Sequence, residues 1–120
     1  MTGARVDART EEGDVRFVLS GDIDLANAAT VEEQLAAAIT NHTARVWLDV
    51  SAVTYLDSAG LRVLFHLVDR LSTLQIAATL VAPLTSPSRR AIDLSGLALL
   101  VPLDPPAPAG RGAGQASGGR

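Results

Sequence analysis

The chain has 120 residues, 48% of them hydrophobic, 19% charged and 3% aromatic, which predicts one folded domain with an aliphatic core. It contains no cysteine, and all ten of its basic residues are arginine, so disulfides, thiolate chemistry and a lysine nucleophile are excluded. The formal net charge of −3 disfavours a direct nucleic-acid partner, because phosphate attraction needs a concentrated basic face.

The apolar stretches of the chain are short. None approaches the roughly 20 residues of a membrane span, and the N-terminal residues lack the apolar core of a signal peptide, so we expect a soluble cytoplasmic protein without a membrane partner. After Leu103 the composition changes to three prolines and five glycines with no large apolar side chain. We therefore expect a domain over residues 1–103 and a disordered tail over residues 104–120.

The first expected element in chain order is a β-hairpin. Val6, Ala8 and Thr10 alternate with charged residues, the letters EEGD form a turn signal, and a second alternation runs from Val15 to Leu19. A helical period follows from Asn27. Its apolar face holds Ala28, Val31, Leu35 and Ile39.

Two short apolar runs, Ala44–Val50 and Ile76–Ala82, are typical of strands buried on both faces of a sheet. A second helical period lies between them, with apolar positions at Leu61, Leu64, Phe65, Val68 and Leu71. The letters TSPSRRAIDLSGL predict a short helix, and the run from Leu99 to Leu103 predicts a last strand. For that short helix we expect Ser86 as N-cap, Pro87 at the first position and Gly96 as left-handed stop.

The resulting order, β-β-α-β-α-β-α-β, predicts a single α/β domain with a mixed, mostly parallel sheet, an opening hairpin and helices packed on it. In such sheets, sites lie at the carboxyl ends of the strands. Two expected loops reach that edge, with the letters SGDIDLAN and SAVTYLDSAG.

These segments together resemble a known family. SGDIDLANAATVEEQLAAAI, VWLDVSAVTYLDSAGLRVLFHLVDRL and TSPSRRAIDLSGLALLVPL, with their spacing, are similar to the STAS domain of bacterial anti-sigma factor antagonists over residues Val6 to Leu103. The resemblance implies that Ser58 is phosphorylated by a partner that is both a serine kinase and an anti-sigma factor. It implies that the unphosphorylated chain binds that partner and frees the sigma factor, and that a phosphatase restores the serine.

The same resemblance places Asp24 at the acidic position beside the phosphoacceptor. One departure concerns the end of the chain: family members commonly add a helix after the last strand, whereas here prolines follow at once.

The residues around Ser58 support two interpretations. Asp57 or Ser58 begins a helix, so the unpaired backbone N–H groups that follow would stabilise a phosphate on the serine. Either Ser58 merely caps the helix, or Asp57 is the cap and the serine hydroxyl is free. We expect Gly60 to keep the approach clear for a docking kinase. The expected partner-binding residues are Asp24, Asp57, Ser58, Ala59, Gly60, Arg62 and His66.

An enzymatic role for Ser58 is not expected. His66 lies eight residues further along the same helix, a rise of roughly 12 Å, so it cannot take a proton from the serine. His42 precedes a strand whose far end leads to Ser58, which places it near the opposite edge of the sheet. Two lone histidines form no metal site, so we expect no metal and no cofactor.

The sequence therefore predicts a non-enzymatic switch, an anti-sigma factor antagonist controlled at Ser58. The alternative is a scaffold or transporter-accessory subunit of the same fold in which Ser58 is only a helix cap. For Asp22 and Asp24, a solvated turn is the competing interpretation.

Overall fold

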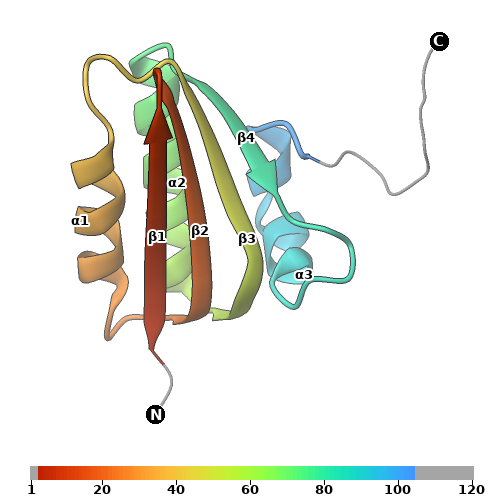
Figure 1. The fold of residues 1–120 in the computed structure, drawn as a ribbon. Helices are drawn as coiled ribbons and strands as arrows, with labels where there is room; N and C mark the ends of the chain where they lie inside the picture. Colours follow the sequence, from red (N-terminus) through yellow and green to blue (C-terminus); the bar gives the residue numbers. More distant parts are fainter. Residues whose placement is uncertain (1–2, 105–120) are drawn as a thin grey trace, which may run out of the picture.

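The computed structural model describes residues 3–104, which form an α/β domain (Figure 1). Its elements are β1 (Ala4–Glu11), β2 (Asp14–Ile23), α1 (Ala28–Ala38), β3 (Arg45–Leu56), α2 (Ser58–Thr73), β4 (Ala77–Val81), α3 (Arg89–Ser95) and the 3₁₀ helix η1 (Leu97–Leu99). The four strands lie in the order β1-β2-β3-β4, with β1 antiparallel to β2 and the other two pairs parallel. The predicted mixed, mostly parallel sheet with an opening hairpin is confirmed.

The turn predicted at the letters EEGD is confirmed, and it consists of two residues. Glu11 pairs with Asp14, and the two residues between them, Glu12 and Gly13, have φ angles of 49° and 89°. Positive φ at both central positions defines a type I′ turn, whose twist matches that of the flanking strands. Glycine adopts this conformation freely, whereas glutamate adopts it at some cost.

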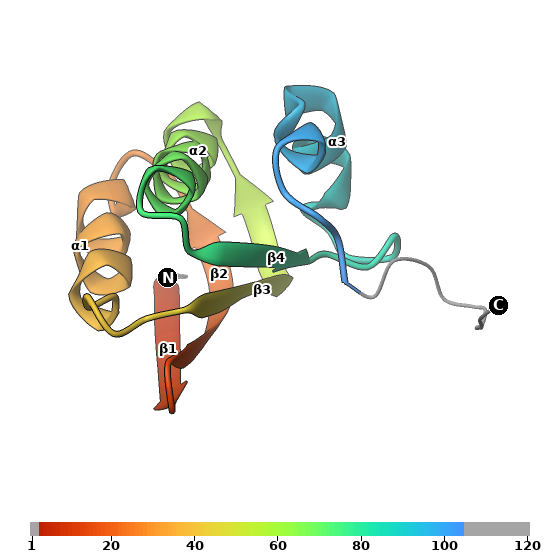
Figure 2. The same ribbon diagram turned by 90° about the horizontal axis from the view of Figure 1, so that it is seen from above.

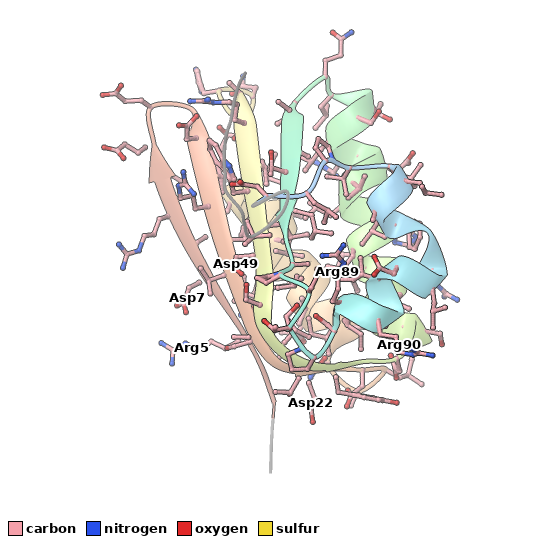
Figure 3. The ribbon with its side chains drawn as sticks, turned by 90° about the vertical axis from the view of Figure 1, so that its right-hand side faces the viewer. Arg5, Asp7, Asp22, Asp49, Arg89 and Arg90 are labelled. Carbon is pink, nitrogen blue, oxygen red and sulfur yellow. The ribbon has the colours of Figure 1, made fainter. Side chains whose placement is uncertain are left out.

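All three α-helices lie on one side of the sheet, as Figure 2 shows from above. The core fills the space between the helices and the sheet, because alternate strand residues and one stripe of each helix are apolar. Phe17 and Leu19 of β2 and Leu64 of α2 are completely buried there. On the opposite, helix-free face, Arg5 and Asp7 project away from the helices in Figure 3.

Strands β2 and β3 are longer than predicted. Residues 20–23 and 51–56, expected as loops, pair with each other as strand residues. The register shifts twice along this pair because β3 carries additional residues, which are β-bulges. The buried positions Val50, Val53 and Leu56 are therefore three residues apart, and the alternation that identifies a strand is lost.

The predicted start of the short helix is wrong. α3 begins at Arg89, and Ser86 is not its N-cap. The Ser86 hydroxyl donates to the carbonyl oxygen of Pro83 at 2.6 Å instead of accepting from a helix N–H. Ser88, the residue before α3, is buried, and its hydroxyl donates to the carbonyl oxygen of Val50 at 3.2 Å. The left-handed stop at Gly96 is confirmed by its φ of 85°.

The predicted last strand, residues 99–103, is reduced to one parallel bridge between Leu80 and Leu103. The Leu80 N–H donates to the carbonyl oxygen of Pro102 at 2.8 Å, and the Asp104 N–H donates to the carbonyl oxygen of Leu80 at 2.8 Å, so this bridge is complete. Pro102 has no N–H with which to extend the pairing towards Leu99. The predicted tail lies outside the described residues from position 105 onwards. Within residues 3–104, no helix combines the length and apolar character needed to span a bilayer.

Candidate functional site

Ser58 is the first residue of α2, at the carboxyl end of β3. Asp57 is the N-cap, and its Oδ1 accepts a hydrogen bond from the Gly60 backbone N–H at 2.9 Å. Ser58 is exposed, and within the described residues its hydroxyl makes no hydrogen bond. The interpretation of Ser58 as the helix cap is therefore wrong: Asp57 takes that role, and the serine hydroxyl is free.

Asp57 also connects the two loops that the sequence places at this edge. Its second oxygen, Oδ2, accepts from the Leu25 backbone N–H at 3.2 Å, and the Asp57 N–H donates to the carbonyl oxygen of Ile23 at 3.4 Å. One carboxylate thus joins the β2–α1 loop to the start of α2. The expected meeting of these two loops is confirmed.

Asp24 shapes the β2–α1 loop from within. Its Oδ1 accepts from the Ala26 N–H at 3.0 Å, and its own N–H donates to Oδ1 of Asn27 at 3.1 Å. Such side-chain to backbone bonds stabilise a turn, so Asp24 has a structural role whatever else it contacts. Neighbouring Asp22, labelled at the lower end of the sheet in Figure 3, accepts from the hydroxyl of Thr54.

Gly60 does not face a partner. It is buried, and a Cβ atom at this position would lie 2.5 Å from the carbonyl oxygen of Ile23 and 2.9 Å from Cδ2 of Leu56. The absent side chain allows α2 to approach the end of β2. The prediction that Gly60 keeps a docking surface clear is wrong, because the missing side chain faces the sheet.

Three residues of α2 form an exposed stripe at four-residue spacing: Ser58, Arg62 and His66. His66 Nδ1 lies 3.2 Å from Oε2 of Glu32, which connects α2 to α1. Ala59 is half-buried beside the stripe. The stripe thus continues from Ser58 along the surface of α2.

The histidines lie away from the serine, as expected. His66 follows it by two turns of helix, and His42 lines a hollow beside the hairpin turn at Gly13, at the other end of the sheet. Among residues 3–104, no three histidine or acidic side chains gather closely enough to hold a metal ion.

Two exposed apolar residues at this edge were not identified from the sequence. Leu25 is 81% exposed in the β2–α1 loop, and Tyr55 is 55% exposed near the end of β3. The available signal for Leu25 was a large apolar residue in the short loop between Ile23 and Ala28. No sequence pattern predicted the exposure of Tyr55 at the end of a strand, because its segment was expected to be a loop.

The protein is an α/β domain with a four-stranded mixed sheet, and its second helix begins with an exposed serine. The chain belongs to the STAS domain family, whose family model matches residues 5–106. The anti-sigma-F factor antagonist RsfB of Mycobacterium tuberculosis is 33% identical over 79 residues, 66% of this chain and 63% of RsfB. BtrV of Bordetella bronchiseptica is 32% identical over 85 residues, 71% of this chain and 72% of BtrV.

Solved structures agree with this assignment. An anti-sigma factor antagonist from Mycobacterium paratuberculosis superposes with a TM-score of 0.74 at 28% identity, covering 86% of each chain. The antagonist SpoIIAA in its unphosphorylated form gives a TM-score of 0.67 at 16% identity, covering 82% of this chain and 87% of SpoIIAA. The second likeness shows the shared fold. The predicted family is confirmed, and these relatives and solved structures carry the name of anti-sigma factor antagonists.

Proposed function

We propose that the protein is an anti-sigma factor antagonist that binds an anti-sigma factor with serine-kinase activity while Ser58 is unphosphorylated. Phosphorylation of Ser58 ends the binding, and a phosphatase restores it. The observation that carries the proposal is that two neighbouring residues at the start of α2 have separate roles. Asp57 caps the helix, so the exposed Ser58 hydroxyl is left available for modification.

The relatives support this proposal. RsfB is named as an antagonist of an anti-sigma factor, and SpoIIAA has been solved in an unphosphorylated and in a phosphorylated form. The same role places this protein in the cytoplasm, with the transcription machinery.

The chemistry is phosphoryl transfer from ATP. The Ser58 Oγ forms a bond to the γ-phosphorus, the bond to the β-phosphate oxygen breaks, ADP leaves, and the hydroxyl proton passes to a base of the kinase. The kinase supplies the catalytic groups. The antagonist supplies an exposed serine on a rigid helix end.

Phosphorylation adds a charge of roughly −1.5 to −2 next to Asp57. In the free protein, the helix N-terminus and solvent stabilise that charge, so the fold tolerates it. In a closed interface the charge loses its solvent, and an unpaired buried charge costs several kcal/mol. That cost corresponds to about a 100-fold or greater loss of affinity, at roughly 1.4 kcal/mol per decade.

Two variants test the proposal. Ser58→Ala should capture a kinase-type anti-sigma factor from a lysate of the source cells and resist phosphorylation, whereas Ser58→Asp should fold but bind at least about 100-fold more weakly. The measurements are pull-down with mass spectrometry, binding constants for the purified partner, and phosphosite mapping after incubation with ATP. Equal affinities of the Ser58→Ala and Ser58→Asp variants for the kinase, or a phosphate found on Ser51 or Thr54 instead of Ser58, would contradict the proposal and favour a scaffold role.

A further inference from the structure

Leu25 is an unusual residue for its position. It is 81% exposed, and it lies in the loop that is joined to the N-cap of α2, beside Ser58. Single exposed leucines are common on protein surfaces, so exposure alone carries no argument. What distinguishes Leu25 is how firmly the backbone around it is held.

The β2–α1 loop is a closely hydrogen-bonded turn. The Asp24 carbonyl oxygen accepts from the N–H groups of Asn27 at 3.1 Å and Ala28 at 2.8 Å, and the Asn27 amide Nδ2 donates to the carbonyl oxygen of Asp22 at 2.8 Å. The Asp24 and Asn27 side chains bond within the same turn, and the Leu25 N–H is held by Asp57. The loop therefore presents an apolar side chain to solvent on a fixed backbone.

An exposed apolar side chain on an ordered backbone has a recognisable use in binding. Association loses less conformational entropy when the contact residue is ordered beforehand, and interface energy concentrates in a few anchors that enter apolar pockets. Leu25 contributes nothing to the protein's own core, which its exposure shows directly. Tyr55, 55% exposed, provides a second apolar side chain at the same edge of the sheet.

The Asp57 carboxylate contacts both the loop that carries Leu25 and the start of the helix that carries Ser58. One oxygen of its carboxylate caps α2 through Gly60, and the other holds the backbone of Leu25. Ser58 is the next residue along the chain. The Asp57 carboxylate thus links the backbone of Leu25 to the start of the helix that carries Ser58.

We propose that Leu25 is the apolar anchor that enters a pocket on the anti-sigma factor kinase, and that Asp57 is the positioning residue that aligns this anchor with Ser58. The inference rests on the proposed function and adds to it the residue that decides partner recognition. Full burial of a leucine side chain corresponds to about a ten- to hundredfold gain in affinity.

The first test compares two exposed leucines. Leu25→Ser should weaken binding of the kinase captured by the Ser58→Ala chain by about tenfold or more. Leu74→Ser is the matched control: Leu74 is 50% exposed just after α2, at the other end of that helix, so its replacement should leave the affinity unchanged. Both variants should keep the thermal midpoint of the wild type. Equal affinities for the two variants would overturn the inference.

The second test removes one of the two side-chain hydrogen bonds of Asp57. In Asp57→Asn the amide oxygen can still accept from Gly60, and asparagine caps helices as well as aspartate does. Its NH₂ group cannot accept from the Leu25 N–H. Amide hydrogen exchange should therefore accelerate at Leu25 but not at Gly60, and kinase binding should weaken. Unchanged exchange at Leu25 would contradict the positioning role.

The third test locates the contact in the complex. A photo-crosslinking amino acid at position 25 should join the chain to the kinase, and the Ser58→Asp change should abolish the crosslink; the same probe at position 74 should give none. If Ser58→Asp releases the kinase but position 25 does not crosslink, the proposed function stands and the anchor is wrong. If Ser58→Asp and Ser58→Ala bind the kinase equally, the proposed function itself fails, and this inference with it.

Discussion

At the scale of single residues, the largest difference between expectation and structure concerns Gly60. Glycine inside a helix usually lowers stability by up to about 1 kcal/mol relative to alanine, so its presence calls for an explanation. The explanation is the carbonyl oxygen of Ile23, 2.5 Å from where a Cβ would lie. A close approach between α2 and the end of β2 excludes any side chain at this position.

Replacing Gly60 with alanine should therefore destabilise the fold. The backbone of α2 or β2 has to shift, and overpacking of this kind costs about 1–3 kcal/mol. Urea unfolding gives the free energy. Gly3→Ala is the control, because a Cβ at Gly3 meets nothing within 4 Å. A gain in stability for Gly60→Ala would show that helix propensity outweighs the contact.

At the scale of elements, the hairpin β1–β2 contains a local conflict. Its type I′ turn requires positive φ at two positions, and Glu12 occupies the first with a φ of 49°. Asparagine adopts positive φ far more readily than glutamate does. The turn is therefore formed by the pairing of the strands rather than by the preference of Glu12.

Glu12→Asn should stabilise the domain by about 0.5 kcal/mol, because the sequence then suits its turn type. Gly13→Ala, at a φ of 89°, should destabilise it by about 1 kcal/mol or more. Thermal unfolding of the two variants should shift the midpoint in opposite directions. A lower midpoint for Glu12→Asn would mean that the Glu12 side chain makes a contribution of its own.

At the scale of the whole molecule, charged side chains are unevenly distributed over the surface. Asp22, Asp24 and Asp57 lie at the edge of the sheet that carries Ser58. The helix-free face carries a mixture of charges, and Arg16 stacks over Trp47 there with its guanidinium carbon 4.1 Å from the ring centroid. A phosphate on Ser58 thus adds to an edge that is already acidic, which supports a switch based on charge.

Deletion of residues 105–120 should leave the thermal midpoint almost unchanged, because these residues contain no large apolar side chain to pack on the domain. A decrease of several degrees, equivalent to about 1 kcal/mol for a domain of this size, would show that the segment packs on the body. The full chain is the control.

The sequence by itself determined the features that depend on neighbouring residues. The apolar period of α2 and its start beside Ser58 follow from residue spacing and helix capping. The end of α3 at Gly96 follows from the preference of glycine for the left-handed conformation. The order of elements followed from the same local patterns, and the family followed from the resemblance of three segments to the STAS domain.

Only the tertiary structure decided features that depend on segments far apart in the chain. β-Bulges removed the alternation that would identify the end of β3, Ser88 is buried against Val50 before the start of α3, and the last strand is reduced to one bridge. The inward face of Gly60 and the exposure of Leu25 likewise depend on packing between β2, the β2–α1 loop and α2. Pairing register and close approach are properties of two segments at once, so no local pattern in either segment specifies them.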